Sequence, residues 1–335
     1  MEKFTMNDTT IAFIGLGLIG GSLAKGIKKA RPDIRIMAYM RTRSKLEQAK
    51  KDGIVDVILD GIDEQLKQCD LIFLCTPVEY NAQYLSKIRS YLKPGALITD
   101  VGSTKTDIHK EILRQGLTDC FVGGHPMAGS EKTGYENATD HLLENAYYIV
   151  TPPEGFNQNG CGYGNISPKY SENVKRIIAV AQTVGAIPLV LDYKEHDTVV
   201  AAISHLPHLV ASSLVNLVKD SDSPAETMKQ VAAGGFKDIT RIASSSPEMW
   251  EQICMTNSEP IADMLERYID SLQDILSEIK GHQGNAIYKL FEKSRDYRNT
   301  ITDRAKGSVE PSYAFSVDMA DEVGAISTIA VILAA

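Results

Sequence analysis

A glycine-rich stretch near the start of the chain restricts the possible folds more than any other feature. The apolar run Thr10–Ile14 predicts a buried strand, and the six residues that follow have the pattern GxGxxG before a predicted helix. The first glycine makes a tight turn, the second lets backbone N–H groups approach a pyrophosphate, and the third lets helix and strand pack closely. A glycine-rich turn without a ligand is the alternative, but this context favours a dinucleotide site. The predicted contacts are Gly15, Gly17, Leu18, Ile19 and Gly20.

Strand and helix patterns alternate over residues 1–191, which predicts an α/β fold with a parallel sheet. Further strands are expected at residues 34–39, 55–58, 70–77, 96–101, 120–122, 146–150 and 187–191. Ligands collect at the carboxyl ends of parallel strands, so residues just after these strands should share one rim. They are Thr76, Pro77, Ser103 and His125. A lone serine is more simply interpreted as the N-cap of the next helix, and its place on the rim adds a second role for Ser103.

The end of the second strand bears on the type of dinucleotide. An enzyme that binds NAD usually carries an acidic residue there for the ribose hydroxyls. This chain has Met40 and Arg41 instead, followed by Arg43 and Lys45. A solvated basic loop and tolerance of a 2′-phosphate are equally good explanations.

Composition excludes several classes of partner. The net charge of −8 argues against nucleic acid, which binds to basic surfaces. We find no apolar run long enough to span a membrane. The five cysteines are scattered and form no pair of the kind that binds metal. We therefore expect a cytoplasmic protein without nucleic-acid, membrane or metal partners.

From residue 192 the pattern becomes helical, which predicts a second domain over residues 192–291, with a hinge near Asp192–His196. His205 and His208 stand three residues apart and could share one helical face. A zinc pair is conceivable there but lacks cysteine or carboxylate partners. Arg241 lies in an apolar setting, and buried arginines usually need a carboxylate. Either Asp238 or the carboxylate of a substrate could supply it.

His125 lies between glycines that let other groups approach closely. With a dinucleotide site upstream and Arg241 downstream, we interpret His125 as the group that takes a proton while a hydride leaves. A neutral imidazole suits that task near pH 7.

Five motifs in this order resemble the prephenate dehydrogenase family, which includes arogenate dehydrogenases. They are GLGLIGGS at 15–22, DVGSTK at 100–105, GHPMAGSE at 124–131, SHLPH at 204–208 and GGFKDITRIA at 234–243. The resemblance implies an α/β Rossmann-type dinucleotide-binding domain followed by an all-α helical dimerisation domain. It also implies a homodimer that oxidises and decarboxylates prephenate to 4-hydroxyphenylpyruvate in tyrosine biosynthesis.

The same resemblance implies roles for individual residues. His125 is the catalytic base on the ring hydroxyl, and Ser103 binds near that hydroxyl and the nicotinamide. Arg241 holds a substrate carboxylate and Asp238 supports it. The remaining residues line the substrate pocket or its mouth: His205, His208, Gly234 and Glu131.

Two features depart from the family pattern. Met40 and Arg41 replace the aspartate that many members carry, so NAD is expected by resemblance and NADP is not excluded. After a charged linker at 292–311, residues 312–335 resemble the first strand and helix of an ACT domain, which leaves feedback by tyrosine open. Three alternatives remain: an arogenate dehydrogenase, a β-hydroxyacid-type dehydrogenase and a dinucleotide sensor without turnover.

Overall fold

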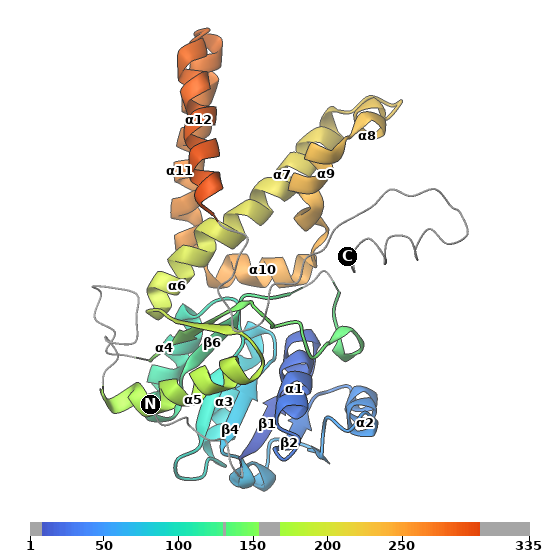
Figure 1. Ribbon diagram of the computed structural model, residues 1–335, viewed down its shortest axis with the longest axis vertical. Helices are drawn as coiled ribbons and strands as arrows, with labels where there is room; N and C mark the ends of the chain where they lie inside the picture. Colours follow the sequence, from blue (N-terminus) through green and yellow to red (C-terminus); the bar gives the residue numbers. More distant parts are fainter. Residues whose placement is uncertain (1–8, 130–131, 154–167, 302–335) are drawn as a thin grey trace, which may run out of the picture.

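The computed structural model describes residues 9–129, 132–153 and 168–301 (Figure 1). Its first part is built on a five-stranded parallel sheet in the order β3-β2-β1-β4-β5. The strands are β1 Thr10–Ile14, β2 Arg35–Tyr39, β3 Val57–Ile58, β4 Leu71–Leu74 and β5 Leu97–Asp100. Ile11 to Ile14 are fully buried, because the core covers both faces of the central strand. The continuous apolar runs in the sequence have this cause.

A second sheet continues from the β5 edge. It contains β6 Gly123–Pro126, β7 Tyr147–Thr151 and β8 Ile187–Val190, in that order. A parallel bridge between Ile98 and Phe121 joins it to β5. The pair β6–β7 is antiparallel, which differs from the wholly parallel sheet that we expected. Parallel neighbours need a crossover helix, whereas the described residues between these strands hold only a short 3-10 turn, Tyr135–Asn137.

Helices cover both faces of the sheet, as the alternating pattern predicts. They are α1 Leu18–Ala30, α2 Arg43–Lys51, α3 Asn81–Arg89, α4 Thr106–Gln115 and α5 Pro168–Thr183. Phe13 and Phe73 stack between neighbouring strands with ring centroids 4.9 Å apart. This packing fixes the carboxyl ends of β1 and β4, where the candidate cofactor residues lie.

Beyond residue 192 the described chain is helical, which confirms the predicted fold class. Its elements are α6 Tyr193–Val200, a π turn Ala201–His205, α7 Leu206–Ser221, α8 Thr227–Val231, α9 Gly234–Thr240, a 3-10 turn Arg241–Ser244, α10 Pro247–Thr256, α11 Ser258–Lys280 and α12 Gly284–Thr300. Figure 1 shows two arms that extend away from the sheet, one formed by α7 with α8 and α9, the other by α11 with α12. Helix α10 lies across their base, close to the sheet domain.

Helix α12 corrects one predicted boundary. We expected a charged linker from residue 292, but residues 292–300 continue the helix to Thr300. Ile287 and Leu290 stand three residues apart and are partly buried, while α12 packs on α11. In the sequence this weak helical signal is hidden by the many charged residues around it, which is why the segment was predicted to be a linker. The rest of the expected linker and the ACT-like segment lie outside the described residues.

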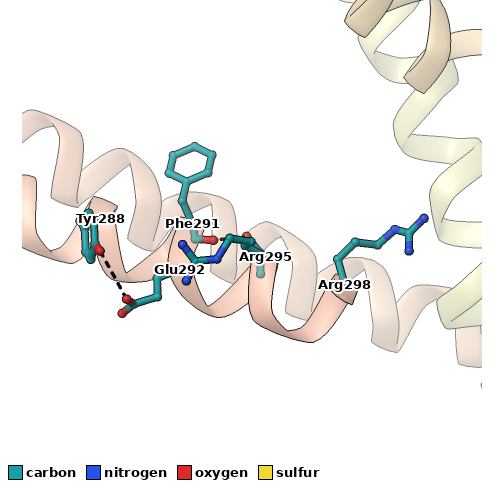
Figure 2. Close-up of a pocket in the computed structure, with 6 residues that line it drawn as sticks. Tyr288, Phe291, Glu292, Arg295 and Arg298 are labelled. Atoms are coloured by element: carbon teal, nitrogen blue, oxygen red, sulfur yellow. Dashed lines mark hydrogen bonds between the residues drawn. The ribbon is translucent and has the colours of Figure 1, made fainter. Parts of the chain in front are cut away.

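Both arms leave apolar side chains exposed. Helix α11 exposes Ile269, Leu272, Leu276 and Ile279 along one face. On α12, Tyr288 and Phe291 border an open groove of about 500 Å³. Figure 2 shows this groove, which is also lined by Glu292, Ser294, Arg295 and Arg298. None of its lining residues belongs to the predicted site.

The continuous helical run Tyr193–Ser221 is long and apolar enough to cross a membrane by length and composition. This differs from our expectation that no run reaches that length. The run also carries His196, Asp197 and His205, which are buried and polar. Their hydrogen bonds hold its first part against the sheet domain, as described below.

Candidate active site

The glycine turn after β1 has the geometry that the sequence predicts. Gly15 has φ +95°, and a Cβ atom there would stand 2.5 Å from the carbonyl oxygen of Cys75. A Cβ on Gly20 would stand 2.7 Å from the carbonyl oxygen of Gly15. Only glycine fits at these two positions, one for its backbone angle and the other for close packing.

The turn is also open on the side where a pyrophosphate would bind. A Cβ on Gly17 would meet no atom within 4 Å. Gly17 is the N-cap of α1, and neither a capping side chain nor an acidic residue occupies the first turn, which starts with Leu18 and Ile19. The N–H groups of this turn therefore remain available to an anion, and the residues fit a dinucleotide.

The residues after β2 differ from the basic loop that the sequence suggests. Arg43 pairs with Asp60 and Glu47, and Lys45 pairs with Glu136. Among the described residues Arg41 forms no ion pair. Its guanidinium lies 5.3 Å from the centroid of the Tyr80 ring, and Met40 packs against the core. Only one of the three cations is therefore uncompensated.

Two further candidate residues follow β4, next to the glycine turn. The hydroxyl of Thr76 donates to Oδ1 of Asn81 at 3.2 Å, and Pro77 is exposed. The bond between Thr76 and the buried Asn81 fixes this loop against the start of α3.

His125 lies within β6, paired with Ile149 of β7, rather than beyond the end of a strand. Its Nδ1 is 2.8 Å from Nε2 of His196, which is fully buried on α6. Nδ1 of His196 is in turn 2.8 Å from Oδ1 of Asp197. A histidine of the sheet domain is thus connected to a histidine and a carboxylate of the helical domain.

Asp197 also caps helix α4 of the sheet domain. It accepts hydrogen bonds from the backbone N–H groups of Lys105 at 2.8 Å and Thr106 at 2.7 Å. We expected Ser103 to be the N-cap of this helix, and the structure contradicts that. The carboxylate from α6 already occupies the first N–H groups, and no hydrogen bond from the described residues links them to Ser103. Ser103 remains partly exposed just before the helix.

A buried ion pair holds the start of β6. Lys105 and Asp100 pair with essentially no exposure, and the ammonium group of Lys105 also donates to the carbonyl oxygen of Gly124 at 2.8 Å. Asp100 accepts from the backbone N–H of Gly124 at 3.2 Å. Both polar groups of the residue before His125 are therefore fixed.

His205, the last residue of the π turn, and His208 on α7 contact one aromatic residue. His208 stacks on Trp250 of α10 with centroids 3.8 Å apart, and His205 meets the same ring edge-on at 5.9 Å. Nε1 of Trp250 is buried and has no partner among the described residues. Asn257 lies 3.1 Å from Nδ1 of His205 and donates to the carbonyl oxygen of Asp197 at 2.9 Å. Through Asn257 and Asp197, His205 is therefore connected to the hydrogen-bonded series that begins at His125.

Arg241 has different surroundings from those we expected. It is exposed, at the start of the turn after α9, and forms no ion pair with Asp238 in the described part of the chain. Burial lowers the pKa of His208, its hydrogen bond with the carbonyl oxygen of Ser204 raises it, and the charge of Arg241 lowers it. Asp238 is also exposed, and Gly234 borders open space. Glu131 lies outside the described residues.

The environment keeps the histidines neutral. Burial lowers the pKa of His125 well below its usual value, and His196, Lys105 and His205 lower it further. Burial lowers the pKa of His205 to about 4. Burial alone would raise the pKa of Asp197, but hydrogen bonds from His196 and Thr106 outweigh it and hold that pKa below normal. The site thus combines neutral imidazoles with one ionised carboxylate.

Sequence reasoning missed four residues of this network: His196, Asp197, Trp250 and Asn257. The sequence does contain a pattern that could have marked His196 and Asp197 as candidates, because these two adjacent ionisable residues precede an apolar helical run at the expected hinge. Trp250 is the only tryptophan in the chain, but nothing in its neighbourhood indicates a site.

Known proteins match the chain along most of its length. Residues 23–160 match the family model of the prephenate dehydrogenase nucleotide-binding domain, and residues 192–293 match that of its dimerization domain. Prephenate dehydrogenase of Bacillus subtilis is 37% identical over 97% of this chain and 85% of its own length. The Lactococcus lactis enzyme of that name is 34% identical over 96% of this chain and 86% of its own.

Solved structures agree. Prephenate dehydrogenase from Aquifex aeolicus, in complex with hydroxyphenyl propionate and NAD+, has a TM-score of 0.77 and 30% identity, covering 88% of this chain and 98% of its own. Arogenate dehydrogenase from Synechocystis has a TM-score of 0.74 and 28% identity, covering 87% of this chain and 99% of its own.

Proposed function

This chain belongs to the prephenate dehydrogenase family, and from this we propose that it oxidises and decarboxylates prephenate to 4-hydroxyphenylpyruvate, with NAD as the acceptor of the hydride. The observation that carries the proposal is the position of His125. It lies on β6 directly after Gly124, which is bonded to Asp100 at the carboxyl end of β5, and its Nδ1 is 2.8 Å from His196 of the helical domain. A base therefore stands where the carboxyl end of the parallel sheet meets the histidines of the helical domain.

The chemistry needs a proton acceptor and a cationic clamp. Prephenate has a ring hydroxyl and a ring carboxylate that blocks aromaticity. Bound NAD would supply the hydride acceptor for the carbon that carries the hydroxyl. His125 accepts the hydroxyl proton as that carbon is oxidised, and carbon dioxide leaves with formation of the aromatic ring. His125 can then return its proton to the phenolate oxygen, so the reaction needs no net proton release.

Other residues orient the two substrates. The glycine turn before α1 and the first turn of that helix, with Gly15, Gly17 and Gly20, would hold the pyrophosphate of bound NAD, and the loop at Thr76–Pro77 would border the nicotinamide. Ser103 lies at the rim beside it and binds near the substrate hydroxyl. We assign the substrate carboxylate to the exposed Arg241, whose planar fork suits it. We assign His205, His208 and Gly234 to the lining of the same substrate site.

Trp250 adds a hydrogen-bond donor that the sequence did not suggest. Its Nε1 is buried without a partner in the described residues, while its ring stacks on His208. An unpaired buried N–H group is costly, so a polar atom of the substrate is a reasonable partner.

The assay that tests this function measures reduced cofactor spectrophotometrically, with prephenate and arogenate each supplied with NAD and NADP. We expect turnover of prephenate with NAD, and His125→Asn should cut kcat by roughly 10²–10⁴ while NAD still binds. A preference for arogenate would show that arogenate, and not prephenate, is the substrate. Binding of NAD without turnover of either substrate would favour a dinucleotide sensor. A near-normal kcat in His125→Asn would show that His125 is not the catalytic base.

We propose NAD as the preferred cofactor with NADP tolerated. No carboxylate follows β2 directly, and Arg41 is available to meet a phosphate or stack on adenine. The pairing of Arg43 and Lys45 with acidic residues limits the attraction for a 2′-phosphate. Values of kcat/KM for the two cofactors should lie within about tenfold, or roughly 1.4 kcal/mol. Met40→Asp should shift the ratio toward NAD, and a thousandfold preference in the starting protein would contradict the proposal.

We propose that the protein is a homodimer formed through residues 192–293, the region that matches a dimerization domain. The exposed apolar faces of α11 and α12 support this, because an unpartnered row such as Leu272 and Leu276 is costly in water. A partner subunit would also cover the exposed apolar residues of α7, such as Leu217. A cytoplasmic location and feedback by tyrosine stay predictions.

A further inference from the structure

His125, His196 and Asp197 form one hydrogen-bonded line across the domain boundary. His125 belongs to β6 of the sheet domain, and the other two belong to α6 of the helical domain. Both links, from His125 Nδ1 to His196 Nε2 and from His196 Nδ1 to Asp197 Oδ1, measure 2.8 Å. All three side chains are buried, so solvent offers no alternative partners.

The protons in this line can be assigned from its end. An ionised carboxylate only accepts hydrogen bonds, and Asp197 already accepts from the N–H groups of Lys105 and Thr106. His196 must therefore carry its proton on Nδ1, which leaves a lone pair on Nε2. Since that lone pair faces His125, His125 must carry its proton on Nδ1. The remaining lone pair of His125 is then on Nε2.

We propose that His196 and Asp197 are positioning residues that fix the tautomer and orientation of His125, so that its Nε2 is the proton acceptor. The proposal rests on the assigned role of His125 as the base. Neither residue needs to touch substrate or cofactor. Because the base and its two supports come from different domains, His125 is prepared for catalysis only when the domains are docked.

The same line supports the positive charge that forms during the reaction. When Nε2 of His125 takes a proton, its Nδ1–H remains bonded to His196, and His196 remains bonded to a carboxylate. Burial, Lys105 and His205 disfavour the protonated form of His125, and so would a positive charge on His196. In the neutral tautomer assigned above, His196 instead offers the lone pair of its Nε2 to Nδ1–H of His125, 2.8 Å away. Removing this acceptor should make His125 harder to protonate.

Two substitutions at His196 separate positioning from packing. In His196→Gln the amide oxygen can accept from Nδ1–H of His125 while the amide nitrogen donates to Asp197. His196→Leu fills similar space but can do neither. We expect His196→Leu to lower kcat by roughly 10²–10³ with unchanged affinity for NAD, and His196→Gln to stay within about tenfold of the starting protein.

The pH profile distinguishes this role from a purely structural one. In His196→Leu the acid limb of kcat/KM should move to lower pH, because the imidazolium has lost its acceptor. A loss of activity without movement of that limb, or equal activity of His196→Leu and the unaltered protein, would overturn the proposal.

A measurement without turnover tests the tautomer directly. In protein labelled with ¹⁵N-histidine, the resonances of His125 are identified by their loss in His125→Asn. We expect a neutral ring with its proton on Nδ1, and a proton on Nε2 would overturn the proposal. If the protein oxidises neither prephenate nor arogenate, the proposed function fails, while the tautomer experiment still decides this inference.

Discussion

Replacing Lys105 with methionine tests how the start of β6 is held. Lys105 has 0% exposure, pairs with Asp100 and donates to the carbonyl oxygen of Gly124 at 2.8 Å. Methionine fills similar volume, so Lys105→Met leaves little cavity. It does leave the carboxylate of Asp100 buried without its cation, supported among the described residues by the N–H groups of Gly102 at 2.9 Å and Gly124 at 3.2 Å.

The magnitude follows from these contacts. Breaking a buried ion pair by removing one partner costs about 3–5 kcal/mol, because a buried charge remains uncompensated. Two N–H donors still solvate Asp100, so we expect the lower end, about 3 kcal/mol of unfolding free energy. kcat should fall as well, since the carbonyl group before His125 loses its donor.

The measurement is urea unfolding at fixed protein concentration, because a dimer's apparent stability depends on concentration. Lys110→Met is the matched control: it is the same substitution within α4, the helix that follows Lys105, at a residue whose side chain is 72% exposed and 3.7 Å from Asp107. The control should leave the unfolding midpoint nearly unchanged. A loss below about 1 kcal/mol in Lys105→Met, or equal losses in both variants, would refute the reasoning.

Three further variants test the substrate clamp, the buried histidines and the dimer. Arg241→Ala should raise KM for the substrate by an amount equivalent to about 1.5–3 kcal/mol. Tm should not change, because Arg241 is exposed and unpaired in the described chain. A lower Tm with unchanged KM would show that the role of Arg241 is structural. Burial lowers the pKa of His109 to about 3, so the unfolded chain binds more protons below pH 6.5 and stability falls as pH decreases. Between pH 7 and 5 the unaltered protein should lose about 2 kcal/mol more than His109→Gln, in which the glutamine amide can still form a hydrogen bond with Thr151; parallel pH profiles in urea unfolding would contradict this. Leu276→Glu should convert the dimer to monomer in light scattering, with Glu278→Gln as the control on the same helix, and an unchanged mass would place the interface elsewhere.

The sequence by itself determined the elements whose causes are local. The turn at Gly15 could be predicted because GxGxxG between an apolar strand and a helix has few other solutions, and the structure shows φ +95° there. The strands around β1 followed from continuous apolar runs, and the helical domain from its periodicity. His125, His205 and His208 were also predicted as site residues from the sequence, because their motifs are contiguous and resemble one family.

Tertiary structure alone decided which distant groups meet. His125 and His196 are 71 positions apart, and Lys105 and Asp197 are 92 apart, so no periodicity connects them. The docking of α6 on the sheet domain gave α4 its cap from Asp197 and excluded Ser103 from that role. Similarly, Asp60 and Glu136 neutralise Arg43 and Lys45, cations that the sequence presents as a basic loop. Local sequence fixes backbone conformation over a few residues, but hydrogen bonds and ion pairs across a domain boundary depend on how the folded layers pack.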